Sequence, residues 1–194
     1  MQIAPNFEAS KWKELNLDDV ESPDWAVAIS TFESRIGERF ITPADFLVAA
    51  EKDVPAIERR FGFAVLAIDC LLIETLGAFL EGLENTKNRS EEIFCKFLIS
   101  RSQFRKDFTH ILAKQFYEEF RCGVLHQGEV GGDSKVWSVG PLIQKDGDRV
   151  IVNRNKLHER LKSEFAVYLH ELQDTNNNQL RSNFRKKMDF IART

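Results

Sequence analysis

The sequence has few cysteines and no arrangement of cysteine and histidine that would hold a metal. Its three cysteines, Cys70, Cys95 and Cys122, are odd in number and widely spaced, and none forms a CxxC pair. This pattern argues against a disulfide framework and fits a reduced, cytoplasmic protein. The four histidines lack the HExxH spacing of a zinc site. We therefore expect no disulfide, no metal and no other cofactor.

The sequence also lacks an excess of basic residues, and its first residues show no signal pattern. Lysine and arginine number 27 against 30 aspartate and glutamate, a net charge of -3. Proteins that wrap duplex nucleic acid are usually basic, so any contact with nucleic acid should be local, in a cleft. The first residues, MQIAPNFEASKWKELN, have no basic and then apolar signal pattern. P-loop, GxSxG and GxGxxG motifs in a suitable context are missing as well.

One stretch, residues 63–80, is apolar enough to suggest a membrane span, but it contains Asp69 and Glu74. Each carboxylate near the centre of a bilayer would cost roughly 2.5–3.5 kcal/mol. We therefore expect a buried helix of a soluble, cytoplasmic protein with no membrane partner.

Apolar residues recur with helical spacing along most of the chain. A Ser-Pro pair predicts a helix from residue 23, and a Thr-Pro pair predicts a separate short helix from residue 43. The longest candidate, residues 56–85, is apolar on nearly every side and should be central. A further helix should begin at Ser90, and after a break near residue 101 another should end at Gly128.

The segment after Gly128 changes character. KVWSV and RVIVN are short and β-branched and flank the turn-rich QKDGDR, which predicts a small β-hairpin. Asn155 should cap the next helix, and a basic helix ends the chain. We expect an α-helical bundle interrupted by one hairpin, with three parts: an N-terminal arm (1–22), a helical domain (23–175) and a C-terminal basic helix (176–194).

Arg121 and His126 are the first candidates for chemistry. His126 should lie in the last turn of its helix, where unpaired carbonyls favour a cation. Histidine titrates near neutrality and suits a general acid or base. Arginine presents a planar fork to phosphate oxygens. The pair is suited to hold a phosphate and move a proton beside it.

Helix geometry complicates this interpretation. Five positions at about 100° each place the two side chains roughly 140° apart around a straight α-helix. A bend at Gly123, or two copies of the helix end facing each other in a symmetric dimer, would bring them together. The ordinary alternative is a helix terminus at which basic residues are stabilising in any case.

Four other residues are candidates for binding or orienting a substrate: Glu74, Tyr117, Cys122 and Gln127. Glu74 lies among apolar neighbours and needs a partner, so it either orients Arg121 or forms a structural ion pair. Tyr117, four residues before Arg121, either stacks on a base or packs in the core. Gln127 either touches a base or phosphate or is solvated. Asp69, near the basic residues that precede the long helix, is expected to be structural.

The run RCGVLHQG resembles the arginine–four residues–histidine motif of the HEPN superfamily (higher eukaryotes and prokaryotes nucleotide-binding domains). FGFAVLAIDCLLIETLGAFLEG resembles the acidic-centred long helix of bacterial HEPN proteins. The segments WAVAISTFESRIGERFITPADFL and NKLHERLKSEFAVYL are similar to the same subgroup, so the resemblance covers about residues 23–172.

This resemblance implies an all-α, HEPN-like up-and-down bundle that forms a homodimer, with two motifs lining one cleft. For active members it implies metal-independent RNA cleavage. In that scheme His126 moves the proton of a ribose 2′-hydroxyl or of the leaving oxygen, and Arg121 holds the scissile phosphate. Active members often have a polar residue after the arginine, whereas this chain has Cys122, a weak hydrogen-bonding residue.

Two hypotheses follow. The first is a metal-independent endoribonuclease of the toxin or defence type, with RNA as substrate and an antitoxin protein as partner; the intact arginine and histidine favour it. The second is a non-catalytic HEPN module that binds nucleotide or RNA, or that serves as a protein-interaction dimer. The near-neutral charge and Cys122 favour the second.

Overall fold

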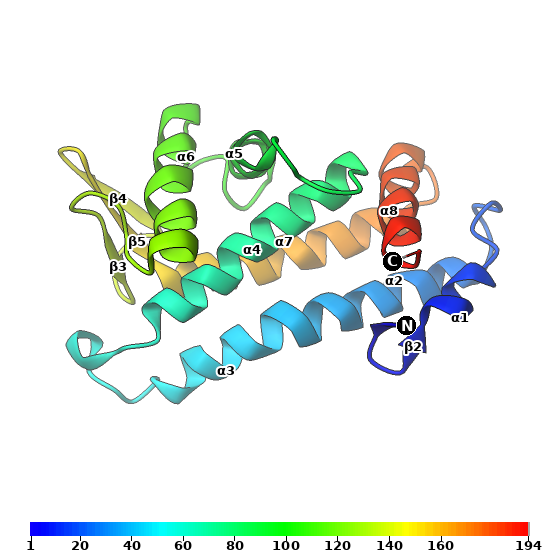
Figure 1. Cartoon of the computed structure of the whole chain (residues 1–194), viewed down its shortest axis with the longest axis horizontal. Helices are drawn as coiled ribbons and strands as arrows, with labels where there is room; N and C mark the ends of the chain where they lie inside the picture. The colour runs from blue at the N-terminus through cyan, green and yellow to red at the C-terminus, as the bar shows by residue number, and fades with distance from the viewer. Residues whose placement is uncertain (194) are drawn as a thin grey trace.

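Helices make up most of the chain, and two small sheets accompany them. The computed structural model describes residues 1–193. Figure 1 shows α4 (Gly62–Glu81) crossing the middle of an elongated molecule, with α7 (Arg154–Gln173) behind it. The three-stranded sheet lies at one end of these helices, and α8 (Asn178–Ile191) lies toward the other. The prediction of a mostly helical protein is confirmed.

The first long helix is one continuous rod made of α2 (Asp24–Ile36), a π-helical turn η1 (Gly37–Ile41) and α3 (Thr42–Ala50). It begins where the Ser-Pro pair predicts. The helix predicted from the Thr-Pro pair is present as α3, but it is not separate, because η1 joins it to α2 without a break at Pro43. Proline lacks an N–H and crowds the carbonyl four residues earlier in an α-helix. The wider turn before it, where the N–H of Thr42 bonds to a carbonyl five residues back, accommodates the proline.

Helix α4 is central, as its composition predicts. It contacts α3, α5, α7 and α8, and its inward leucine, isoleucine and phenylalanine side chains are buried. Its predicted start near residue 56 is too early. Ala56–Glu58 form a short 3₁₀ turn, η2, and α4 begins only at Gly62. The Glu51 carboxylate accepts the backbone N–H of Phe61 at 3.0 Å, which ties down the chain before the helix.

Of the described helices, α4 alone is long and apolar enough to cross a membrane. In its most apolar 18-residue window, 56% of the residues are buried inside the fold. The two carboxylates that the window contains, Asp69 and Glu74, both have hydrogen-bonding partners. This is the environment of a core helix in a soluble protein.

The motif lies on a helix that changes its winding. After α5 (Ser90–Ser100), the chain forms α6 (His110–Phe116) and continues directly into a π-helix, η3 (Tyr117–Gln127). The predicted break is present but longer, because Thr109 caps α6 by accepting a backbone N–H at 3.2 Å. Gly128 ends the helix as predicted, with a left-handed φ of 71°. A series of buried rings packs this helix on α5: Phe94, Phe116 and Phe120.

The two segments of the predicted hairpin are strands that pair with each other, but in parallel, and a third strand that was not predicted forms the hairpin. The sheet contains β3 (Lys135–Trp137), β4 (Ile143–Asp146) and β5 (Arg149–Asn153), in the order β3-β5-β4. KVW pairs with RVIVN in parallel, and β4 lies between them in sequence. The antiparallel hairpin joins β4 to β5 through a two-residue turn, in which Gly147 has a φ of 62°.

Asn153 caps α7, whereas the prediction placed the cap at Asn155. The Asn153 side-chain oxygen accepts the backbone N–H of Asn155 at 3.1 Å and that of Lys156 at 3.2 Å. Its amide nitrogen donates to the Gly140 carbonyl at 2.9 Å. One side chain therefore joins the sheet to the helix that follows it.

Both ends of the chain share the core. The first residues form β1 (Gln2–Ala4), β2 (Phe7–Glu8) and α1 (Ala9–Lys13). Trp12 is buried, donates its indole N–H to Asp189 of α8 at 2.8 Å, and packs edge-on against a phenylalanine of α8. Helix α8 in turn packs on α4. The segments predicted as an arm and as a basic terminal helix thus support each other against the bundle.

Candidate functional site

Arg121 and His126 are in contact, with 3.1 Å between Nη1 and Nε2. The straight-helix geometry expected from the sequence would separate them. They meet because the segment that carries them, η3, is a π-helix. Its backbone bonds reach five residues back instead of four, so side chains five apart stack as i and i+4 do in an α-helix. The change in winding brings the two side chains together within one chain.

Gly123 allows the chain after the motif to fold back on η3. A Cβ at this position would lie 2.5 Å from the carbonyl oxygen of Glu129 and 3.1 Å from the nitrogen of Gly131. The Gly131 N–H donates to the carbonyl of Glu119 at 2.8 Å. The returning loop therefore packs directly on the backbone of the π-helix. Gly123 provides a close approach, and not the bend that the sequence suggested.

Glu74 of α4 holds Arg121. Its Oε2 accepts from Nη2 at 2.8 Å and from Nε at 3.2 Å, while its Oε1 accepts from the hydroxyls of Thr86 at 2.5 Å and Ser90 at 2.8 Å. Burial raises the pKa of Glu74, but the hydrogen bonds from Thr86, Ser90 and Arg121 lower it by more. Glu74 stays ionised, and it leaves the Nη1 edge of the guanidinium facing His126.

Tyr117 supports Arg121 from the same helix. Its ring centroid lies 5.4 Å from the Arg121 Cζ, a cation–π contact, and 5.4 Å from the ring centroid of Phe94. Burial raises the pKa of Tyr117 to about 12, so its phenol keeps its proton at neutral pH. The half-buried ring packs in the protein and steadies the guanidinium at the same time.

The remaining two candidates lie on η3 beside the pair. Cys122 is half-buried and carries a free thiol. Gln127 is exposed in the last turn, next to His126, which is also exposed. All the site residues predicted from sequence are therefore on η3, apart from Glu74 on α4.

An open hollow of about 270 Å³ adjoins Arg121. Helix α4, the loop that follows it, η3 and α8 contribute to its wall, and His126 is not among the residues that line it. The lining residues are Leu71, Glu74, Thr75, Ala78, Glu84, Asn85, Thr86, Arg121 and Lys187. Arginine and lysine supply its positive charge and two glutamates its negative charge.

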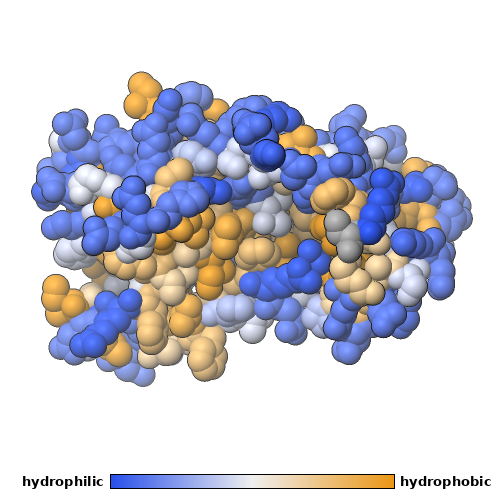
Figure 2. All heavy atoms as spheres, viewed as in Figure 1, coloured by the Kyte–Doolittle hydropathy of each residue, from blue (hydrophilic) through white to orange (hydrophobic). Residues whose placement is uncertain are grey.

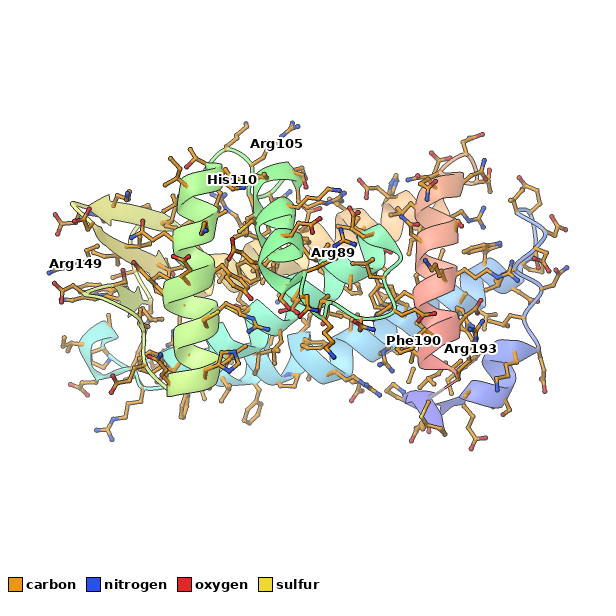
Figure 3. The ribbon with its side chains drawn as sticks, turned by 45° about the horizontal axis from the view of Figure 1, so that its top comes forward. Arg89, Arg105, His110, Arg149, Phe190 and Arg193 are labelled. Carbon is orange, nitrogen blue, oxygen red and sulfur yellow. The ribbon has the colours of Figure 1, made fainter. Side chains whose placement is uncertain are left out.

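The other histidines lie elsewhere. His110 is the first residue of α6 and therefore lies at the opposite end of this helix from His126 (Figure 3). His158 is buried on α7. Within residues 1–193, no three histidine, cysteine, aspartate or glutamate side chains are grouped as metal ligands.

Asp69 pairs with His158, a contact that sequence reasoning missed. The sequence placed Asp69 near basic residues before the helix, but its Oδ1 lies 2.8 Å from His158 Nδ1, and His158 Nε2 lies 3.3 Å from Asp45. Burial raises the pKa of Asp69 to about 6 against the opposing effect of His158. The only signal in the sequence was a carboxylate in an apolar helix, which requires a partner but does not indicate which residue it is.

Comparisons with protein-family models, with curated proteins and with solved structures find no match to this chain. The interpretation of the site therefore depends on its own geometry and chemistry.

Proposed function

We propose that this protein is a metal-independent endoribonuclease in which Arg121 and His126 act on one phosphodiester. The observation that carries the proposal is their 3.1 Å contact, in which His126 is exposed and Arg121 lines an open hollow. A guanidinium that holds a phosphate and an imidazole that moves a proton are the two functions that cleavage of RNA by its own 2′-hydroxyl requires.

The contact defines the form of histidine that would act. The guanidinium only donates, so in this contact Nε2 of His126 is the accepting nitrogen. When a bound phosphate takes over the Nη1 edge of Arg121, the lone pair of Nε2 is released and serves as a general base. It takes the proton of a ribose 2′-hydroxyl as the 2′-oxygen bonds to phosphorus. The bond to the 5′-oxygen breaks, which gives a 2′,3′-cyclic phosphate and a 5′-hydroxyl, and a second acid supplies the proton of that hydroxyl.

Arg121 would neutralise the charge that develops on the phosphate oxygens. Glu74 fixes the guanidinium by two hydrogen bonds, and Tyr117 lies against it. Arginine side chains are flexible, so this support lowers the entropy lost when the phosphate binds. Glu74 and Tyr117 are thus positioning residues in the proposal, while Arg121 and His126 touch the reacting atoms.

A homodimer would supply the second acid. The exposed face of α4 carries Phe63, Ala67 and Leu71 at i, i+4 and i+8, and the first and last of these are 46% and 43% exposed. Phe46 of the adjoining α3 is 75% exposed. Figure 2 shows this apolar area over α3 and α4. Such patches mark interfaces, and because Leu71 also lines the hollow beside Arg121, pairing across it brings two motifs near each other.

The test is RNA cleavage in the presence of EDTA. The unmutated protein should cut single-stranded RNA and leave cyclic phosphate ends, and His126→Ala should reduce the rate at least about a hundredfold, the usual contribution of a general base. His110→Ala is the matched control, because it removes a histidine from the other end of the same helix. Equal rates for both variants, or cleavage that EDTA abolishes, would exclude the proposed chemistry.

A non-catalytic module that binds RNA or nucleotide is the second candidate. One observation favours it: Glu74 already occupies the Nε and Nη2 edge of Arg121, which leaves Nη1 to hold a phosphate without clamping it for cleavage. In this case the unmutated protein would not cut RNA but would bind it, and Arg121→Ala would weaken that binding. The same cleavage assay, read together with a binding titration, separates the two candidates.

A further inference from the structure

A second pocket lies where η2, the start of α4 and β3 meet. Its volume is about 440 Å³, within the range of about 300–1,000 Å³ usual for small-molecule sites. It shares no lining residue with the hollow beside Arg121. The residues that line it are Ala56, Ile57, Arg59, Gly62, Lys135, Val136, Trp137, Ser138 and Arg154.

The pocket carries positive charge that the fold neutralises only in part. Arg154 is 2% exposed and pairs through Nη2 with Glu51, while its Nη1 is buried without any hydrogen-bond partner. Arg59 donates only to backbone oxygens, one of them at 2.9 Å. Lys135 forms no ion pair with any residue in the described part of the chain. Three cations with one carboxylate suit an anionic ligand, and Arg154 brings an unused donor.

An aromatic surface lies beside these cations. Trp137 is 46% exposed, and Ile57, also in the wall, is 89% exposed. Trp12 and Trp25 are both buried. A large aromatic ring left open to solvent in a pocket wall is a platform for a planar ring, and an indole is well suited to stack on a nucleobase.

We propose that this pocket binds a nucleotide: the base stacks on Trp137, Lys135 and Arg59 hold the phosphate, and the charge of the buried Arg154 beneath them favours an anion. A nucleotide matches both parts of the lining, because its planar base suits the exposed indole and its negatively charged phosphate suits the cations. The nucleotide comes either free or as one unit of single-stranded RNA. The proposal is independent of cleavage at Arg121 and His126, because the two sites have no lining residue in common.

Tryptophan fluorescence provides the measurement. Trp137 is the exposed indole among the three tryptophans, so quenching by an added nucleotide reports on this pocket. The full chain is titrated with adenosine 5′-monophosphate, with adenosine, and with a short oligoadenylate RNA. The RNA titration uses His126→Ala, so that the RNA stays intact. We expect saturable quenching by the monophosphate or by the RNA, and at least about tenfold weaker binding of adenosine.

Variants test each half of the lining. Lys135→Ala and Arg59→Ala keep the fluorophore and should each weaken nucleotide binding. Trp137→Ala, followed by equilibrium dialysis with labelled nucleotide, should weaken it at least about tenfold, the effect of losing one stacked base. Lys145→Ala is the matched control: it removes an exposed lysine of the same sheet that does not line the pocket. Melting curves establish that each variant is folded.

Each outcome decides the proposal. Saturable quenching by the monophosphate supports free nucleotide as the source, and saturation by the RNA alone supports the strand. Equal affinity for adenosine and its monophosphate would overturn the proposal, as would the absence of saturation with every probe, or losses no greater in the pocket variants than in Lys145→Ala. Loss of RNA cleavage in His126→Ala with unchanged nucleotide binding would separate this site from the proposed catalytic one.

Discussion

Arg121 and His126 are five residues apart in sequence, and their side chains meet at 3.1 Å because the helix that carries them widens at Tyr117. The same molecule uses a second π-helical segment in η1, where it accommodates a proline. In η3 the widened backbone positions side chains. π-helical segments are often found at functional sites, and this one changes which residues share a helix face.

The first prediction concerns Gly123. Gly123→Ala places a methyl group against the backbone of the returning loop, so it should destabilise the protein by about 1–3 kcal/mol, as overpacking does. It should also disturb the Arg121–His126 contact. Denaturant unfolding measures the first effect and RNA cleavage or binding the second.

Gly37→Ala is the control, because Gly37 is also in a π-helical segment but has nothing within 4 Å of the added carbon. It should be neutral or stabilising, by up to about 1 kcal/mol from helix propensity. Equal effects of the two substitutions would show that the loop contact at Gly123 is unimportant.

The second prediction concerns the ion pair under Arg121. Glu74→Gln keeps the shape of the side chain but removes the charge, and should destabilise by about 1–2 kcal/mol, less than a fully buried pair because both side chains keep some exposed surface. The pKa of Glu74 is lowered from its ordinary value of 4.5. Its contribution to stability is therefore full above pH 4.5 and is lost as the pH falls through the lowered pKa.

Unfolding measured from pH 3 to 7 checks this prediction. The difference in stability between wild type and Glu74→Gln should be constant near neutrality and should shrink in acid. Glu84→Gln, in the same hollow but exposed and without an ion pair among the described residues, should change little. A wild-type advantage that grows in acid would contradict the assigned sign.

Much of this architecture could be predicted from local sequence patterns. Where the structure differs from the prediction, the difference has a physical cause. The apolar periodicity of α4, the Ser-Pro start of α2 and the glycine stop after His126 are local signals, and the structure has all three. The run through Pro43 was not predictable, because a π-helical turn leaves no distinct mark in composition. For the same reason, the 140° separation expected for Arg121 and His126 was wrong.

Contacts between residues far apart in the sequence were the other feature that local patterns could not fully predict. A carboxylate in an apolar helix requires a partner, and Arg121 was a named candidate for Glu74, 47 residues away. His158 lies 89 residues from Asp69 and no local pattern joined them. The sequence prediction paired the segments of β3 and β5 but missed β4, which forms the antiparallel hairpin with β5, because β4 is polar along most of its length.

The third prediction concerns the buried pair of Asp69 and His158. Burial lowers the pKa of His158, but the hydrogen bond and charge of Asp69 raise it above the ordinary 6.5. Asp69 has a pKa raised from 3.8 to about 6. Both groups hold a proton more tightly in the folded state. The stability that His158 contributes is therefore full below pH 6.5 and is lost as the pH rises through its raised pKa. The stability that Asp69 contributes falls as the pH rises from 3.8 to about 6.

Asp69→Asn removes the titration of Asp69 and also the charge that raises the pKa of His158. The free energy of unfolding of wild type should therefore fall relative to that of Asp69→Asn as the pH rises from 4 to 8. Asp107→Asn, which alters a partly exposed ion pair with Arg160, should keep the wild-type slope. Parallel profiles for wild type and Asp69→Asn would rule out this pair as a source of pH dependence.

The last prediction concerns the apolar face of α4 and the proposed dimer. Leu71 is 43% exposed and lies beside the hollow that Arg121 lines, so Leu71→Glu places a charge in the proposed interface without entering the core. It should shift the protein from dimer to monomer in light scattering and reduce RNA cleavage, because each cleft would lose its second histidine. Ile111→Glu is the matched control: Ile111 is 76% exposed, but lies on α6 at the end distant from His126. If wild type is monomeric, or if Leu71→Glu stays dimeric, this face is not the interface and the second acid must come from the same chain or from water.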